Sequence, residues 1–300
     1  MGETKEKFFA LKTREDVANL LGIKEKSLRY FLYVIKPDNM YHEFQIQKKC
    51  GGKRTICAPD KKLKNIQRKL ANVLNCVYKA KSAAHGFVKD KDIVSNAKNH
   101  TKRRYVLNLD LENFFDQINF GRVRGMLIKP PYGIGEEAAT VIAQIACYKG
   151  KLPQGAPSSP ILTNMICSPM DTQLTRVAMK YKLRYSRYAD DITFSSFKEE
   201  MSQGIASISE FGVNVGKELA DIIEKNGFNV NVGKTRLFSY NNRQEVTGLV
   251  VNRFVNIPRE YIKEIRAMLD HCRKFGTYAA AKEYIQKGKC KKCKNWLIDK

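Results

Sequence analysis

The chain has 300 residues, a formal net charge of +24 at pH 7 and 43% hydrophobic residues. This length and composition exclude a mini-scaffold and argue against disorder, so we expect a folded chain with a sizeable core. The positive charge is concentrated at the two ends: residues 1–104 hold 25 Lys and Arg against 10 Asp and Glu, and residues 271–300 hold 9 against 2. Such a local excess favours a phosphate-rich partner, because each neutralised phosphate releases counterions.

The sequence has neither the pattern of an export signal nor that of a membrane span, since the uncharged run 152–170 is interrupted by prolines. We therefore expect an intracellular protein with no membrane partner, whose eight cysteines are free thiols. Cys290 and Cys293 are the one closely spaced pair. They predict either a zinc site or, as we favour because no second pair or histidine lies near them in the sequence, a solvated basic tail.

The first 45 residues are predicted to form a helical segment. Thr13 with Asp16 three residues later is typical of a capped helix, and Gly22 is a suitable end for it. A second helical pattern covers residues 24–34. DNA-binding helix-turn-helix modules begin in the same way, so the segment is either such a head or, as we favour, a helical accessory segment.

Residues 46–104 are predicted to form a basic lobe. Gly51 and Gly52 are typical of a hairpin turn, and residues 53–59 after them of a short, positively charged strand. Residues 61–78 carry apolar side chains at helical spacing among basic ones, which indicates an amphipathic helix.

Further strands are predicted from alternating side chains and from turn residues. Residues 104–111 alternate like a buried strand, and residues 183–188 and 192–196 are strand-like runs on either side of a hairpin at 189–191. Residues 246–255 are expected to add another strand.

Helices are expected between these strands. Residues 114–126 resemble a turn that leads into a helix, and Ser159 before a proline is a suitable cap for a helix that runs to about residue 182. Pro169 lies inside that pattern and predicts a kink or a break. Residues 218–226 have the pattern of another helix.

Three aspartates carry the chemistry that the sequence predicts. Asp110 ends a predicted strand, and Asp190 and Asp191 lie at the tip of a predicted hairpin. Two adjacent acids alone also fit a solvated turn. Carboxylates that meet at a sheet edge, however, are costly to hold together unless a cation neutralises them, and Mg²⁺ is the natural cation. Two such ions support nucleotidyl transfer, in which a hydroxyl attacks an α-phosphate and pyrophosphate leaves.

Three motifs resemble those of reverse transcriptases. Residues 188–191 (Tyr-Ala-Asp-Asp) resemble the YxDD box, residues 108–115 resemble motif A, and residues 152–160 resemble motif B. The resemblance implies a right-hand polymerase of the α+β class, with fingers, a ferredoxin-like palm and a thumb. The residues that it makes catalytic and metal-binding are Asp110, Asp190, Asp191 and, through its carbonyl, Leu111.

The same resemblance implies a site for deoxynucleoside triphosphates. Phe115 would crowd the 2′ position of the incoming sugar and select deoxynucleotides, unless it is a core residue instead. Gln154 would contact the base pair, and Gly155 would let the backbone approach the nucleotide. The resemblance also implies that Lys53, Arg54 and Lys234 bind the phosphates of the incoming nucleotide, and that Lys234 acts as a general acid.

Two further motifs resemble signatures of retron reverse transcriptases. Residues 96–100 (Asn-Ala-Lys-Asn-His) match NAxxH, and residues 246–248 (Val-Thr-Gly) match VTG. Judged from neighbouring residues alone, His100 would also fit a packed histidine, and Thr247 with Gly248 an ordinary bend in a strand. The resemblance makes candidate RNA-binding residues of Asn96, His100, Val246, Thr247 and Gly248.

Membership in that family implies a bacterial, cytoplasmic enzyme that copies part of a cognate structured non-coding RNA into branched, RNA-linked single-stranded DNA. Synthesis would be primed from a guanosine 2′-hydroxyl, and the system would act in phage defence with an effector protein. The sequence shows no ribonuclease H domain, so a host ribonuclease H would remove RNA. The lobes expected are a helical N-terminal segment at 1–45, fingers at 46–104, a palm with interleaved fingers elements at 105–245, and the end of the palm with a short thumb at 246–300.

The alternatives are a group II intron-like or diversity-generating reverse transcriptase, a palm-fold nucleotide cyclase, and a non-catalytic RNA-binding protein. The NAxxH and VTG pair disfavours the first, and the motif B loop disfavours the cyclase. The presence of all three aspartates disfavours a non-catalytic protein.

Overall fold

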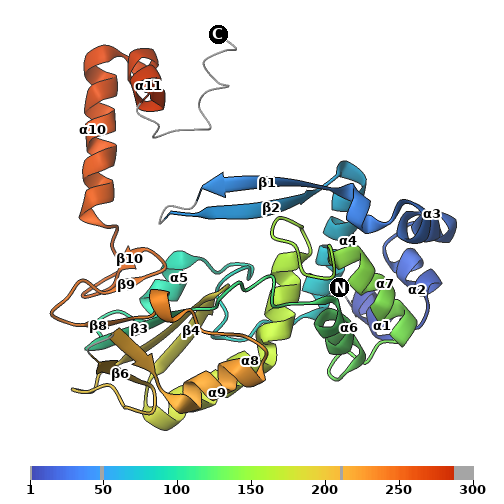
Figure 1. Cartoon of the computed structure of the whole chain (residues 1–300), viewed down its shortest axis with the longest axis horizontal. Coiled ribbons are helices and arrows are strands. Elements are labelled where there is room, and N and C mark those ends of the chain that lie inside the picture. The colour runs from blue at the N-terminus through green and yellow to red at the C-terminus, as the bar shows by residue number, and fades with distance from the viewer. Residues whose placement is uncertain (1, 48–50, 210–211, 287–300) are drawn as a thin grey trace.

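The computed structural model describes residues 2–47, 51–209 and 212–286, and Figure 1 shows how their helices and strands are arranged. A four-stranded antiparallel sheet organises residues 105–239, with the strand order β4-β5-β3-β8. Its strands are β3 (Tyr105–Asp110), β4 (Arg184–Tyr188), β5 (Asp191–Ser196) and β8 (Arg236–Ser239).

Two helices connect the strands of this sheet. Helix α8 (Ser159–Tyr181) lies between β3 and β4 in the chain, and α9 (Lys217–Lys225) lies between β5 and β8; both lie below the sheet in Figure 1. The resulting β-α-β-β-α-β order with an antiparallel sheet is that of a ferredoxin-like unit. The predicted α+β fold with a ferredoxin-like palm is therefore confirmed.

The two faces of β3 pack into different cores because successive side chains of a strand point to opposite sides. Leu107 and Leu109 lie in the main core with the strands and helices of the palm. Val106 points to the other face, into a second cluster with Ala97 and Val246. The segments around these last two residues thus support the back of the sheet.

The basic lobe predicted at 46–104 contains a hairpin whose first strand begins earlier, at Tyr41. Strand β1 pairs with β2 in antiparallel register, as the glycine turn predicted, and the loop that follows Leu152 contacts β2. Helix α4 packs against β2 and α7, and α6 packs against α7 and α8. The elements are β1 (Tyr41–Gln47), β2 (Lys53–Pro59), α4 (Lys61–Val77), α6 (Phe120–Ile128) and α7 (Glu136–Ala146).

The N-terminal segment is helical, as predicted, and Thr13 and Asp16 form a reciprocal capping box. Phe8 and Leu28 are buried in the main core, so the segment packs into the same core as the rest of the lobe. Its elements are α1 (Gly2–Phe9), α2 (Arg14–Leu20), α3 (Glu25–Tyr30), the π-helical turn η1 (Phe31–Ile35) and the 3₁₀ turn η2 (Pro37–Met40).

Six smaller elements complete the palm. Helix α5 packs against the hairpin of β9 and β10, and β6 pairs with β7. The 3₁₀ turn η3 precedes β8. The bounds are α5 (Ile93–Lys98), β6 (Ala206–Ser209), β7 (Gly212–Val215), η3 (Val232–Lys234), β9 (Glu245–Val246) and β10 (Leu249–Val250).

The last two described helices are α10 (Arg259–Phe275) and α11 (Thr277–Gln286), which project away from the palm in Figure 1. The sequence analysis did not predict α10. None of the described helices is long and apolar enough to cross a membrane. Cys290 and Cys293 lie outside the described residues.

Two local predictions were wrong. The strand expected at 246–255 is interrupted, because Thr247 and Gly248 have positive φ angles of 48° and 79° and turn the chain back. Ser159 is not the cap of α8 but its first residue. Of the kink or break predicted at Pro169, the break is ruled out, because α8 is continuous there. The turn predicted from residue 114, by contrast, does lead into a helix, which begins at Phe120 and is capped by the side chain of Asn119.

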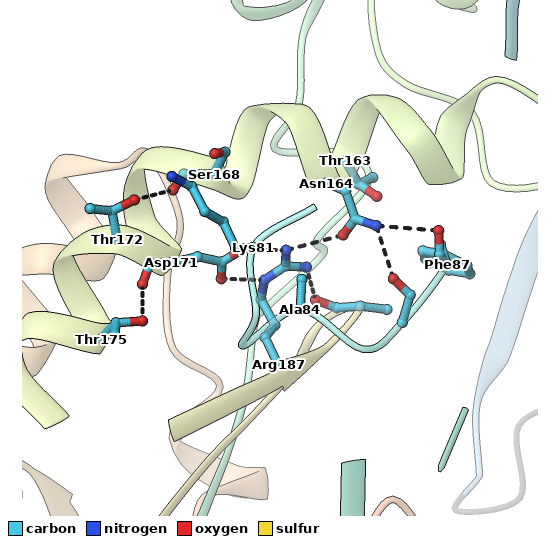
Figure 2. A network of polar contacts seen from close by, with 12 residues as sticks. Lys81, Ala84, Phe87, Thr163, Asn164, Ser168, Asp171, Thr172, Thr175 and Arg187 are labelled. Carbon is cyan, nitrogen blue, oxygen red and sulfur yellow. Dashed lines mark hydrogen bonds and ion pairs between the residues drawn. The ribbon is translucent and has the colours of Figure 1, made fainter. Parts of the chain in front are cut away.

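A buried ion pair joins α8 to the hairpin of β4 and β5, and Figure 2 shows its network. The guanidinium of Arg187 donates to both carboxylate oxygens of Asp171, at 2.8 and 2.7 Å, and to the side-chain oxygen of Asn164 at 3.1 Å. It also donates to the carbonyl of Ala189 at 3.0 Å, at the turn of the hairpin. Both charged side chains are fully buried, so the turn is fixed from beneath by a desolvated pair.

His100 connects β4 to β5 from the other face of the sheet. Its two ring nitrogens lie 2.7 Å from the hydroxyls of Ser186 and Ser195. Because the Ser186 hydroxyl donates its proton to Asn96 at 2.6 Å, His100 Nε2 donates to Ser186 and Nδ1 accepts from Ser195. A neutral ring satisfies both bonds. Burial accordingly lowers the pKa of His100 to about 3.

Asp171→Asn should lower the free energy of unfolding by about 3–5 kcal/mol, because it leaves the charge of Arg187 buried without a counterion. Denaturant unfolding of the purified chain measures this. Asp270→Asn is the matched control, since Asp270 pairs with Lys274 on an exposed helix face and should matter by less than about 1 kcal/mol. Equal effects of the two substitutions would contradict a structural role for the buried pair.

His100 also predicts a pH dependence of stability. Its folded pKa lies below the usual value of 6.5, so the unfolded state takes up a proton first, and stability is lost as the pH falls from 6.5 towards 3. Between pH 6 and 4.5, His100→Gln should reduce this loss by on the order of 1 kcal/mol per pH unit. His42→Gln, at an exposed position of β1, should keep the wild-type slope. Identical slopes in all three proteins would refute the assignment.

Candidate active site

The three predicted aspartates meet at one end of the palm sheet. The register of β3 and β5 places Asp110 directly opposite Asp191. The backbone of Asp190 is joined to the end of β3 as well, since its carbonyl accepts a hydrogen bond of 3.1 Å from the N–H of Leu111. Asp110 and Asp190, 80 positions apart in the sequence, thus belong to one site.

The turn before these carboxylates is held tightly. Ala189 has a positive φ of 58°, and its N–H group lies so close to Gly86 that a Cβ atom there would be 2.4 Å from the nitrogen. The side chain of Asn164 donates to the carbonyl of Gly86 at 2.9 Å and accepts from Arg187. The turn is therefore enclosed by α8 on one side and by the segment around Gly86 on the other.

The carboxylates repel one another in a partly desolvated place. Burial, followed by the charges of Asp190 and Asp110, raises the pKa of Asp191 to about 7, although solvent still reaches this side chain. Burial likewise raises the pKa of Asp190. Lys234 relieves part of this charge, because its ammonium donates to both oxygens of Asp110 at 2.8 and 2.9 Å.

The donor set suits a hard divalent cation, although it is not a closed metal cage. Carboxylate and carbonyl oxygens are the ligands that Mg²⁺ prefers. Within the described part of the chain, no three His, Cys, Asp or Glu side chains converge as a preformed metal cluster. Burial and, after it, the charges of neighbouring carboxylates raise the pKa values of Asp190 and Asp191, and a bound cation would favour their charged forms.

A cavity of about 570 Å³ opens from these carboxylates toward β2. Cations, aromatic residues and the first residues of the motif B loop line it. Of the candidate nucleotide-binding residues it brings together Lys53, Arg54, Leu111, Phe115, Gln154 and Lys234 with Asp110 and Asp190. Asp191 and Gly155 are not among the residues that line it.

Gly155 has a different neighbour from the one expected. It has a φ of 125°, and a Cβ atom there would lie 2.9 Å from the carbonyl oxygen of Cys57 on β2. The N–H of Cys57 donates to the carbonyl of Gln154 at 2.9 Å. The glycine therefore allows the loop to pack against the fingers hairpin, and this packing presents Gln154 to the cavity.

The two neighbouring phenylalanines have different environments. Phe114 is 3% exposed and stacks on Phe228 with ring centroids 5.4 Å apart. Both residues contribute to the lining of the cavity, but Phe115 is only partly buried. Phe114 is thus the core residue of the pair, and Phe115 occupies the position from which a side chain can meet a ligand.

Three of the five candidate RNA-binding residues are enclosed. Asn96, His100 and Val246 are each at most 1% exposed, and the first two bond to the hydroxyl of Ser186. These side chains are unavailable to an RNA in this structure, because they connect the sheet to the segments behind it. The remaining two, Thr247 and Gly248, lie at the turn between β9 and β10 with more exposure.

The sequence analysis missed a basic and aromatic part of the cavity. Lys149 donates to Glu43 at 2.8 Å, and the hydroxyl of Tyr148 donates to the same carboxylate at 2.7 Å. Both residues and Lys151 line the cavity. The signal was present in the run Tyr-Lys-Gly-Lys directly before motif B.

Comparison with known proteins shows the family to which the chain belongs. The family model for the reverse transcriptase (RNA-dependent DNA polymerase) matches residues 46–276. The chain is 33% identical to the retron Mx162 reverse transcriptase of Myxococcus xanthus over 89% of its own length and 60% of that protein's. It is 35% identical to the retron Ec86 reverse transcriptase of Escherichia coli, over 85% of this chain and 77% of that protein.

Among solved structures, the apo telomerase of Candida tropicalis aligns with 72% of this chain and 47% of its own at 15% identity, and its TM-score of 0.49 is too low to support an argument. The chain spans about three fifths of the Myxococcus xanthus relatives that it matches. The family model covers most of the chain, and the Escherichia coli enzyme is similar over more than three quarters of its length. The chain therefore belongs to the reverse transcriptase family and, within it, to the retron reverse transcriptases.

Proposed function

We propose that this chain is an RNA-directed DNA polymerase whose nucleotide site is the cavity between β2 and the palm carboxylates. The observation that carries the proposal is the composition of this cavity. Carboxylates at the end of the palm sheet, cations of β2 and aromatic rings all line it, and Lys234 lies beside Asp110. A nucleoside triphosphate needs all three, because its phosphates are anionic, it is bound together with a divalent cation, and its base is flat.

Each charged residue of the cavity would have a separate role in nucleotide transfer. Lys53 and Arg54 would bind the phosphates of the incoming nucleotide from the fingers hairpin. Lys234, whose bond to Asp110 raises its pKa, would remain charged beside the leaving pyrophosphate and offer it a proton. The attacking hydroxyl of the primer would approach from the palm.

Asp110, Asp190 and Asp191, with the carbonyl of Leu111, are the groups that would hold Mg²⁺. Bound Mg²⁺ would activate the hydroxyl and stabilise the charge of the departing pyrophosphate. The protein's own part is to keep these carboxylates together despite their repulsion. The bonds of Arg187 and of the Leu111 N–H to the turn do this.

We further propose that the template is a cognate structured non-coding RNA, part of which is copied into branched, RNA-linked single-stranded DNA from a guanosine 2′-hydroxyl. The similarity to named retron enzymes of two bacteria supports this. Cytoplasmic action, removal of RNA by a host ribonuclease H, and phage defence with an effector protein complete the proposal.

Replacing Asp190 and Asp191 together by Asn should reduce Mg²⁺-dependent DNA synthesis at least about a thousandfold, because several kcal/mol of transition-state stabilisation are lost. Primer extension on an RNA template measures this. In cells that carry the gene with its flanking DNA, the RNA-linked DNA product should disappear as well. The variant should unfold at no lower denaturant concentration than the wild type, since neutral side chains no longer repel.

Asp221→Asn, on α9, is the matched control and should keep full activity. Undiminished polymerisation by the double variant would refute the assignment of the metal site. Polymerisation in vitro without an RNA-linked product in cells would refute the retron reaction alone.

Phe115→Ala should admit ribonucleotides, because the ring that meets the 2′ position is gone. We expect the preference for deoxynucleotides, as a ratio of kcat/KM values, to fall by roughly one to two orders of magnitude. Phe115→Tyr keeps the ring and should keep the preference. If the alanine variant discriminated like the wild type, Phe115 would have no part in sugar selection.

A further inference from the structure

A second hollow lies at the other end of the palm sheet, and we call it the distal groove. It has a volume of about 440 Å³. Three consecutive cations and three aromatic rings line it: Lys102, Arg103, Arg104, Tyr105, Phe197 and Tyr240. None of these residues lines the catalytic cavity.

The sheet separates the two sites. Tyr105 begins β3 and Asp110 ends it, so the groove lies about 17 Å from the carboxylates at the usual rise of a strand. Phe197 follows the last residue of β5, and Tyr240 follows the last residue of β8. The groove therefore lies at the end of the sheet where β3 begins and β5 and β8 end, away from the catalytic carboxylates.

The cations of the groove are poorly compensated. Arg103 is 9% exposed, and its Nε has no hydrogen-bond partner among the described residues. No carboxylate of the described chain forms an ion pair with it. Glu199 lies 3.6 Å from Arg104, but both side chains are largely exposed, so the pair is weak. The groove thus presents net positive charge to any ligand.

The aromatic rings are exposed beside these cations. Phe197 is 59% exposed and Tyr240 is 46% exposed. The guanidinium of Arg103 lies 3.6 Å from the centre of the Phe197 ring, which fixes that ring from one side. Exposed rings next to cations are the surface on which unpaired bases stack while their phosphates are bound.

The backbone of the basic run is held by residues in and beside the two signature segments. The side-chain amide of the buried Gln244 donates to the carbonyls of Arg103 and Arg104, at 3.0 and 3.2 Å. The N–H of Lys102 donates to the carbonyl of Val251, just after β10, at 3.2 Å, and the side chain of Arg103 donates to the carbonyl of Asn99, inside the NAxxH segment, at 3.3 Å. Residues on both sides of the VTG turn and one residue of NAxxH thus support the basic run.

We propose that the distal groove binds an unpaired segment of RNA, with phosphates at Lys102 and Arg104 and bases stacked on Phe197 and Tyr240. Ser239 and Asn241 also line the groove and offer polar side chains to a 2′-hydroxyl, which favours RNA over DNA. A duplex fits less well, since its bases are already stacked. The inference rests on the proposed function only in taking RNA as the template.

The test uses the full chain and a fluorescent 12-nucleotide oligouridylate, with an unlabelled primer–template hybrid in excess to fill the catalytic cavity. Lys102→Gln with Arg104→Gln should weaken binding and reduce the slope of log affinity against log salt by about 1.4, since two phosphate contacts are lost. Tyr240→Ala should weaken binding by roughly 5- to 150-fold. Lys217→Gln with Lys225→Gln, at exposed positions of α9, removes the same charge elsewhere and should leave binding unchanged.

Primer extension on the short hybrid should be unchanged in every one of these variants, so a failure of the groove and a failure of the polymerase are separable. The proposal is overturned if both groove variants bind the oligouridylate like the wild type, or if the α9 control weakens binding equally. Tighter binding of an oligothymidylate or of an RNA duplex of the same length would overturn the choice of unpaired RNA.

Discussion

The bond from Arg187 to the carbonyl of Ala189 is the interaction on which the catalytic geometry depends. A buried ion pair contributes little net stability, since its desolvation offsets its attraction, and apolar side chains could fill the same space. They could not donate to that carbonyl. Because Arg187 is held at the same time by Asp171 and Asn164 of α8, the turn before Asp190 has one position relative to the helix. The pair therefore contributes geometry more than stability.

That geometry is needed because the carboxylates of the site repel one another. Carboxylates placed opposite each other across β3 and β5 repel, and the pKa of Asp191 rises to about 7 through burial and through Asp190 and Asp110. If the turn were loosely held, the carboxylates would move apart and their repulsion would fall. Because the turn is enclosed between α8 and Gly86, the carboxylates stay close together, and their repulsion favours the binding of a divalent cation. Stability is given up locally for function, as is common at active sites.

The sequence predicted those features of the fold that depend on neighbouring residues. Alternation in β3, the hairpin of β4 and β5 and the capping box at Thr13 follow from neighbouring residues, and the placement of Asp110 with Asp190 followed from the family motifs. It could not predict the role of His100, whose partners Ser186 and Ser195 lie 86 and 95 positions away. The close approach of Gly155 to β2 is equally non-local. A motif shows that a residue type is required; whether it meets a ligand or supports the fold depends on contacts between distant segments.

The NAxxH and VTG signatures illustrate this difference. As motifs they indicated RNA contact, yet Asn96, His100 and Val246 are enclosed. Their position behind β3 and β5 nevertheless fixes the start of β3, where the cations of the distal groove lie, while the other end of the same strand carries Asp110. The six-residue strand β3 thus has the cations of the distal groove before its first residue and the carboxylate of Asp110 at its last. Residues that never touch RNA can set the spacing between its binding and its copying, because a rigid sheet transmits the position of one end to the other.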